Sequence, residues 1–251
     1  MAHTIESYAV IACAKANEWE EALNLIELYS QKTMSAAKQK SVVSVAAVNA
    51  LIRACGRKCR PDIAVQLLND MSVRYNVEPD EVSYRNAIIT CNQAEHREMR
   101  SNNSSVGLKW WECSLSLLRR MSEDGLKPSL QTYSSVISAC EAAGEWQRAI
   151  GVLKLMPSFA PILGNGASDY IGTADPEPAN LYCLNAAIAA CEKGGAWVEA
   201  VQVRFDPNAI INFDCEIQEV DLSASLLDLP AVREHSIHDK ERNTSKLCHS
   251  Q

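Results

Sequence analysis

A short apolar pattern that ends in cysteine returns five times along this chain, and it limits the possible folds more than any other feature. The copies lie at residues 7–13, 49–55, 86–91, 134–140 and 185–191. Within each copy the apolar residues follow the spacing of a helix that is buried along one side. A pattern that returns at intervals of a few tens of residues is typical of a helical repeat protein.

A second apolar pattern follows some of these copies after a polar or glycine-containing break. It begins with tryptophan at Trp19, Trp146 and Trp197. Each unit is therefore predicted to be a helix, a turn and a second helix, with the tryptophan packed over the mouth of the hairpin rather than stacked on a ligand. Trp111 and Trp146 are 35 residues apart, so the unit has about 35 residues and longer intervals contain insertions.

One such hairpin cannot bury its apolar side alone, so neighbouring hairpins are expected to stack into an array with a continuous core. The composition agrees, because 47% of the residues are hydrophobic but only 6% are aromatic, which suits thin layers of closely packed helices. The five cysteines that end the copies, out of ten in the chain, are then predicted to be small apolar core residues. Five separate helices cannot bring them together on one metal ion.

The repeat closes with a recognisable signature. Tyr84 and Tyr133 open first helices, Met71 and Met121 lie near the ends of second helices, and residues 125–129 read Gly-Leu-Lys-Pro-Ser. Residues 76–80, Asn-Val-Glu-Pro-Asp, form a second copy of this closure. Over about residues 4–208 the chain resembles the pentatricopeptide repeat (PPR) family. The resemblance implies an all-α fold, a right-handed superhelical solenoid of antiparallel helix hairpins, with the first helices lining the concave surface.

The resemblance divides the chain into five repeats and a tail. Repeat 1 covers residues 4–44 and is weak, and repeat 2 covers 45–80. Repeat 3 covers 81–129, with an insertion within 92–109 that separates its two helices, and repeat 4 covers 130–180, with a loop at 157–180. Repeat 5, residues 181–208, is truncated, and residues 209–251 form an acidic tail that is expected to be poorly ordered.

The PPR resemblance implies binding to single-stranded RNA, one base per repeat, through two side chains that contact the base edge. One reading residue follows the tyrosine position of the first helix, and the other ends the repeat. The implied pairs are Asn49 with Asp80, Arg85 with Ser129, Ser134 with Asn180, Ser7 with Ser44, and Asn185 with Asn208. By the family's preferences, Asn49 and Asp80 resemble a uracil reader, and Ser134 and Asn180 an adenine reader.

Other polar residues of these units have plainer interpretations. Arg85 with Ser129 is an uncommon pair in the family, so that repeat contacts phosphate or nothing at all. Lys58 and Arg60 lie near a turn, where they either touch phosphate or form a solvated face, and a solvated face is the commoner outcome.

The charge leaves two classes of partner open. The net charge is −7, but residues 206–251 carry nine acidic and four basic residues, whereas residues 32–127 carry fifteen basic and ten acidic ones. If the basic side chains line the concave surface, an RNA partner is favoured. If they lie on the convex side, a protein-interaction scaffold that accepts a peptide or helix is favoured. A third alternative is a truncated product whose repeats bind nothing well.

No pattern predicts catalysis, a metal site or a cofactor. The sequence has no glycine-rich phosphate loop, nucleophile elbow or carboxylate pair. In the tail, Asp221 and Leu222 lack the His-Gly that would continue the motif of the Smr nuclease-like domain found in some PPR proteins, and His235 and His238 lie in a polar, disorder-prone segment. No membrane partner, small-molecule substrate or transit peptide is predicted, so a mitochondrial or chloroplast location rests on the resemblance alone.

Overall fold

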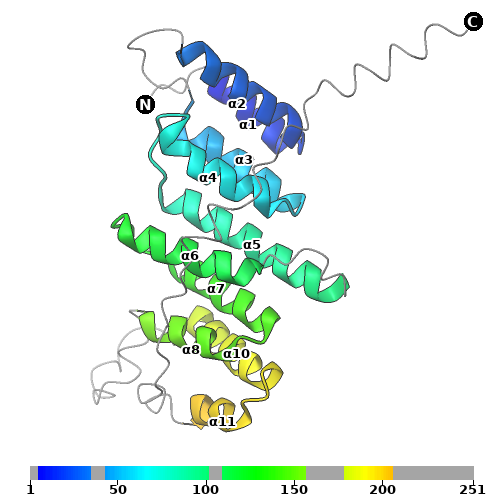
Figure 1. The fold of residues 1–251 in the computed structure, drawn as a ribbon, viewed down its shortest axis with the longest axis vertical. Helices are drawn as coiled ribbons and strands as arrows, with labels where there is room; N and C mark the ends of the chain where they lie inside the picture. Colours follow the sequence, from blue (N-terminus) through cyan, green and yellow to red (C-terminus); the bar gives the residue numbers. More distant parts are fainter. Residues whose placement is uncertain (1–4, 35–42, 102–108, 157–177, 206–251) are drawn as a thin grey trace, which may run out of the picture. The chain divides into compact units, whose positions relative to one another are not determined.

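The computed structural model describes residues 5–34, 43–101, 109–156 and 178–205. Within these ranges the chain forms ten helices and no strand (Figure 1). The helices are α1 (Ile5–Lys15), α2 (Trp19–Met34), α3 (Val45–Arg57), α4 (Pro61–Val73), α5 (Glu81–Ser101), α6 (Trp110–Glu123), α7 (Leu130–Ala143), α8 (Trp146–Leu155), α10 (Pro178–Lys193) and α11 (Trp197–Phe205).

The helices pair into hairpins, and the hairpins stack in chain order. The first helix of each hairpin contacts the next first helix, from α1 through α3, α5 and α7 to α10. Each second helix packs against its own first helix, and α2, α4, α6 and α8 also contact the first helix that follows (Figure 1). The first helices therefore form one layer and the second helices another. The predicted all-α solenoid of antiparallel hairpins is confirmed.

Local sequence signals set several helix ends. Ser44 and Ser129 are the N-caps of α3 and α7, and the side chain of each accepts a hydrogen bond from a backbone N–H in the first turn. Pro61 occupies the first turn of α4, where its missing N–H costs nothing. Gly144 ends α7 with a φ of 74°, a left-handed conformation that glycine adopts without strain.

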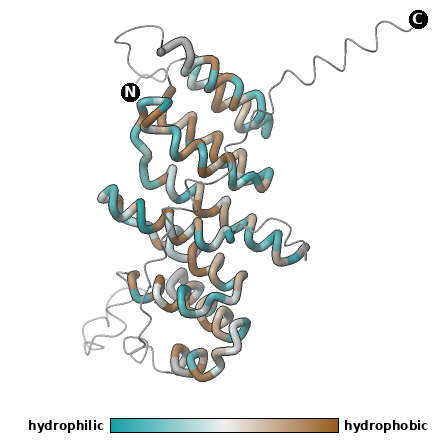
Figure 2. The backbone as a smooth tube through the Cα atoms, in the orientation of Figure 1, coloured by the Kyte–Doolittle hydropathy of each residue, from teal (hydrophilic) through white to brown (hydrophobic). Residues whose placement is uncertain are grey.

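The core runs along the interface between the two layers. Figure 2 shows hydrophobic residues recurring along each helix, with polar residues at the positions between them. Cys55, Cys91, Cys140 and Cys191 are all 0% exposed, in agreement with their predicted role as small core residues. Cys13, the fifth of these cysteines, is only half-buried, so the prediction is wrong for the first repeat. Burial raises the pKa of the Cys55 thiol to about 12, so this side chain stays protonated and behaves as an apolar group.

The tryptophan prediction holds for helix starts but fails for one side chain. Trp19, Trp146 and Trp197 begin α2, α8 and α11, as expected. The ring of Trp197 is nevertheless 72% exposed, so the prediction that it packs over the hairpin mouth is wrong. The side chain of Trp146 lies against Gly194, in the turn of the next hairpin. No described hairpin follows α11, so Trp197 has no such neighbour in the described part of the chain.

The insertion predicted within residues 92–109 is not simply a spacer between two helices. Helix α5 continues without interruption to Ser101, so much of the insertion is additional helix. The added turns also bind the start of α6, because Glu95 accepts a hydrogen bond from the backbone N–H of Trp111 at 3.1 Å. Glu98 accepts another from Trp110 Nε1 at 2.9 Å. None of the described helices combines the length and apolar character that crossing a membrane requires.

Candidate nucleic-acid interface

The predicted first-helix reading residues occupy equivalent positions in successive hairpins. Ser7, Asn49, Arg85, Ser134 and Asn185 each lie six residues before the core cysteine of their helix. Helices α1, α3, α5, α7 and α10 carry them in that order. Because the spacing is the same and the first helices pack side by side, the five residues occupy equivalent positions along the layer of first helices. Ser7 and Asn49 are buried, Arg85 and Ser134 are half-buried, and Asn185 is exposed.

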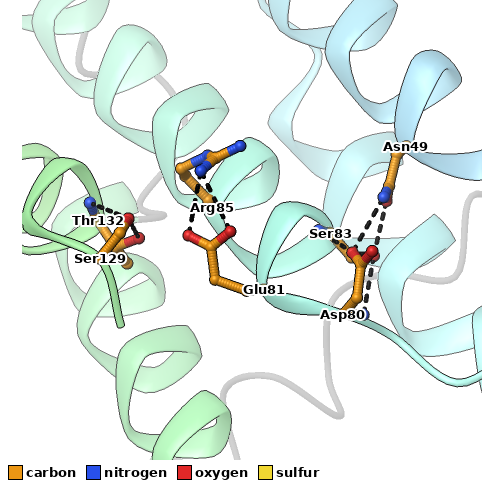
Figure 3. A network of polar contacts seen from close by, with 7 residues as sticks. All are labelled: Asn49, Asp80, Glu81, Ser83, Arg85, Ser129 and Thr132. Carbon is orange, nitrogen blue, oxygen red and sulfur yellow. Dashed lines mark hydrogen bonds and ion pairs between the residues drawn. The ribbon is translucent and has the colours of Figure 1, made fainter. Parts of the chain in front are cut away.

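Asn49 and Asp80 are brought into direct contact, as Figure 3 shows. Asn49 Nδ2 donates to Asp80 Oδ1 at 3.0 Å, although the two residues belong to different segments. Asn49 comes from the first turns of α3, and Asp80 stands immediately before α5. The last residue of one repeat thus lies beside the reading residue of that repeat's own first helix because α3 and α5 are neighbours in the layer.

Asp80 is also the cap of α5, which fixes its position. The backbone N–H of Ser83 donates to Asp80 Oδ1 at 2.8 Å, a capping bond at the usual spacing. Burial alone would raise the pKa of the Asp80 carboxyl, but hydrogen bonds from Asn49 and Ser83 outweigh it and lower the pKa below its ordinary value. The carboxyl is therefore ionised at neutral pH and acts only as an acceptor.

Ser83 is a member of this cluster that the sequence analysis missed. Its Oγ lies 2.6 Å from Asn49 Oδ1 and 2.8 Å from Asp80 Oδ1, and its side chain is fully buried. The sequence carries a signal only for the cap itself, because aspartate is a favoured residue immediately before a helix. That signal predicts the cap, whereas the contact with Asn49 depends on how α3 packs on α5.

Ser7 and Ser44 are the second implied pair that the structure brings together. The backbone N–H of Ser44 donates to Ser7 Oγ at 3.1 Å. Ser44 Oγ accepts from Ala47 N at 3.2 Å and caps α3. The arrangement parallels Asn49 with Asp80, with a backbone group in place of one side chain.

Arg85 and Ser129 instead bond to other partners. Arg85 Nη1 pairs with Glu81 at 3.1 Å on the same helix, and Ser129 Oγ lies 2.9 Å from Thr132 Oγ1 at the start of α7 (Figure 3). The ion pair satisfies the guanidinium locally, so this pair does not present the donor and acceptor groups that its neighbour presents.

The two remaining pairs are only partly described. Ser134 Oγ donates to the carbonyl oxygen of Gln131 at 3.0 Å, and Asn185 is exposed on α10. The side chain of Asn180 and all of Asn208 lie outside the described residues, as do the tail and its histidines.

Comparison with known proteins agrees with this architecture. A model for the PPR repeat matches residues 46–75, which contain the hairpin of α3 and α4. A model for the pentatricopeptide repeat domain matches residues 116–158, which include α7 and α8. The chain therefore contains pentatricopeptide repeats. One relative is a chloroplastic pentatricopeptide repeat-containing protein of Arabidopsis thaliana, 22% identical over 71% of the chain. The match spans only 16% of that relative's length.

The basic residues of the central segment, residues 32–127, are divided between the two layers. First helices carry Arg53, Arg57, Arg85, Arg97 and Arg100, whereas second helices carry Lys32, Arg119 and Arg120. Arg53 is exposed one turn after Asn49, so it lies on the same side of α3. Arg57 donates to Asn17 Oδ1 and to the carbonyl oxygen of Ala14, and it thereby joins α3 to the end of α1.

Near the first turn of α4, Arg60 pairs with Asp62 at 2.9 Å and lies over the ring of Trp19. Lys58 is exposed in the preceding turn. Among the described residues, no group of three or more histidine, cysteine or acidic side chains is placed to hold a metal ion.

Proposed function

We propose that this PPR chain binds single-stranded RNA along its layer of first helices, and that Asn49 with Asp80 reads one base. The observation that carries the proposal is the contact between these two side chains, which joins a donor to an ionised acceptor while Asn49 keeps 8% of its surface exposed. The pentatricopeptide repeats support RNA as the partner. A role in organellar RNA processing or stability rests on the resemblance and on the chloroplastic relative.

The remaining hydrogen-bonding capacity of the pair favours uracil. Asn49 Nδ2 carries two hydrogens, of which one is donated to Asp80, and the carboxylate of Asp80 keeps lone pairs for a further donor. Uracil has a carbonyl acceptor next to an N–H donor on its pairing edge, so it matches a donor beside an acceptor. Cytosine has the opposite order, an amino donor beside a ring-nitrogen acceptor. The chemistry of the pair thus agrees with the preference that the family resemblance implies.

Arg53 is placed to add a sequence-independent contribution. Its exposed guanidinium lies one helical turn beyond Asn49 on the same face of α3. A cation at this distance from a bound base meets the sugar-phosphate backbone rather than the base edge. We therefore assign Arg53 to phosphate binding and Asn49 to base discrimination. The other implied pairs, Ser7 with Ser44, Ser134 with Asn180 and Asn185 with Asn208, stay proposals of the same kind.

The first prediction concerns base preference. The purified chain is titrated with short oligouridylate, oligocytidylate and oligodeoxythymidylate, which avoids any dependence on binding register. We expect RNA to bind more tightly than DNA, and uridylate more tightly than cytidylate. In Asn49→Ala, the loss of one hydrogen bond of about 1 kcal/mol should reduce the preference for uridylate about fivefold. Arg53→Ala should weaken both RNAs alike and reduce the salt dependence of binding.

Gln147→Ala is the matched control, because Gln147 is an exposed amide on the second helix α8. It should change neither affinity nor preference. Equal binding of RNA and DNA at low salt, with no effect of Asn49→Ala, would contradict the proposal and leave a protein-interaction scaffold as the alternative.

A further inference from the structure

We propose that Ser83 is a positioning residue for base discrimination, acting through the side-chain amide of Asn49. The inference rests on the proposed RNA-binding function and adds to it a residue that does not itself touch RNA. Ser83 has no exposed surface, whereas Asn49 keeps 8% of its surface exposed. Any influence of Ser83 on a bound base must therefore pass through its neighbours.

Three contacts close a ring on the amide of Asn49 (Figure 3). Asn49 Nδ2 lies 3.0 Å from Asp80 Oδ1, Asp80 Oδ1 lies 2.8 Å from Ser83 Oγ, and Ser83 Oγ lies 2.6 Å from Asn49 Oδ1. The ring occupies the edge of the amide that joins its oxygen and nitrogen. An amide held along this edge cannot use the same edge for a two-point contact with a base.

The contact lengths favour one arrangement of the protons in this ring. The carboxylate of Asp80 cannot donate, so the Nδ2 side of the amide must face it. The hydroxyl of Ser83 has one proton, and the shorter of its two contacts is the one to Asn49 Oδ1. The backbone N–H of Asp80 donates to Ser83 Oγ at 3.2 Å, and we assign the hydroxyl proton to the shorter contact, with Asn49 Oδ1. Ser83 therefore ties down the oxygen of Asn49 while Asp80 ties down its nitrogen.

The equivalent positions in neighbouring repeats lack this arrangement. Ser83 lies two residues before the reading residue of the next repeat, and the corresponding residues are Ala47 and Thr132. Ala47 has no hydroxyl, and the Thr132 hydroxyl contacts Ser129 at 2.9 Å. The reading residue of that repeat is Arg85, which has no side-chain amide and pairs with Glu81. The closed ring thus coincides with the one described pair that joins an amide to a carboxylate.

The ring determines what Asn49 offers to a base. With Oδ1 held by Ser83, the group that remains on the nitrogen is a single N–H donor, which matches a carbonyl oxygen of uracil. Without Ser83 the amide can leave the ring and turn its oxygen outward, where it would accept the amino group of cytosine. Loss of Ser83 should therefore weaken discrimination between uracil and cytosine more than it weakens overall affinity.

The test compares Ser83→Ala, Ser83→Thr and Thr132→Ala with the wild-type chain. Ser83→Thr keeps the hydroxyl, and Thr132→Ala removes a buried hydroxyl from the first turn of α7 without touching Asn49. The ratio of uridylate to cytidylate affinity is measured for each variant. NMR of the free chain follows the side-chain NH2 group of Asn49, and circular dichroism checks the fold.

We expect Ser83→Ala to reduce the affinity ratio about fivefold, the effect of one lost hydrogen bond. It should also speed exchange of the Asn49 amide protons with water. Ser83→Thr and Thr132→Ala should match the wild type in both measurements. An unchanged ratio in Ser83→Ala would overturn the inference even if the wild type binds RNA well.

An equal loss in Thr132→Ala would also overturn it, because the effect would then be one of general stability. If the wild type binds no RNA, the proposed function fails and the positioning role fails with it. That outcome is distinguishable, because the NMR measurement reports the ring in the absence of RNA.

Discussion

Glu95 is a carboxyl group placed where charge is costly. Its side chain is 2% exposed and accepts a hydrogen bond from the backbone N–H of Trp111. Burial raises the pKa of Glu95, and the nearby Glu98 and Glu112 add to the effect, while hydrogen bonds from the start of α6 oppose it. A negative charge at the N-terminus of α6 is favourable, so the site balances helix capping against desolvation.

This balance predicts a dependence of stability on pH. Between the ordinary glutamate pKa of 4.5 and the raised value in the folded chain, the folded state binds more protons than the unfolded state. The free energy of unfolding should therefore fall as pH rises through this window. Glu95→Gln keeps an oxygen acceptor for Trp111 but cannot ionise. We expect its free energy of unfolding, measured in urea from pH 4.5 to neutrality, to rise relative to the wild type as pH increases.

The control for this prediction is Glu192→Gln, which removes the same charge from an exposed position on α10. Its free energy of unfolding should change with pH in the same way as that of the wild type. If the free energy of unfolding of Glu95→Gln also changed with pH as the wild type does, burial of Glu95 would have no energetic consequence. The prediction would then be wrong.

At the scale of elements, successive hairpins touch through their turns. A Cβ on Gly194 would lie 2.4 Å from Trp146 Cδ1 and 2.8 Å from the carbonyl oxygen of Gly144. Both atoms belong to the preceding hairpin, and one of them is backbone, so they cannot move aside cheaply. The absence of a side chain at Gly194 therefore allows the hairpin of α10 and α11 to approach the hairpin of α7 and α8.

Gly194→Ala should consequently lower the free energy of unfolding by about 1–3 kcal/mol, the usual cost of overpacking. Chemical denaturation of the full chain measures it. Gly125→Ala is the comparison, because a Cβ there meets nothing within 4 Å and only the φ of +73° opposes it. Gly194→Ala should affect α10 and α11 directly, whereas Gly125→Ala should affect only the turn after α6. Full stability in Gly194→Ala would show that the two hairpins do not approach this closely in solution.

At the scale of the whole molecule, each hairpin contacts only its neighbours. Helices α3, α5 and α7 have first helices on both sides, whereas α1 has a described neighbour on one side only. Stability in such an array is approximately a sum of local terms and nearest-neighbour terms. We therefore expect amide hydrogen exchange to be slowest in α5 and α7 and faster in α1, α2 and α11.

Hydrogen exchange with mass spectrometry checks this gradient, and Gly194→Ala sharpens it. The substitution should speed exchange in α10 and α11 and leave α3 and α4 nearly unchanged. Uniform acceleration along the whole chain would mean that the hairpins unfold as one cooperative unit, contrary to the prediction.

The amino-acid sequence alone determined the class of fold and the position of the turns. The returning cysteine pattern, the tryptophans that begin α2, α8 and α11, and the serines that cap α3 and α7 act within a few residues. Helical periodicity and capping depend on neighbours along the chain, so a sequence shows them directly. The resemblance to the PPR family added the pairing of Asn49 with Asp80, which lie 31 residues apart.

The tertiary structure decided everything that depends on a neighbouring helix. The polar sequence after Asn92 suggested a spacer, but packing against α6 extends α5 to Ser101 and buries Glu95. The exposure of Trp197 depends on which hairpin follows it, and the ring on Asn49 depends on how α3 lies against α5. Local propensity cannot encode such contacts, because their free energy comes from groups that meet only after the hairpins have stacked.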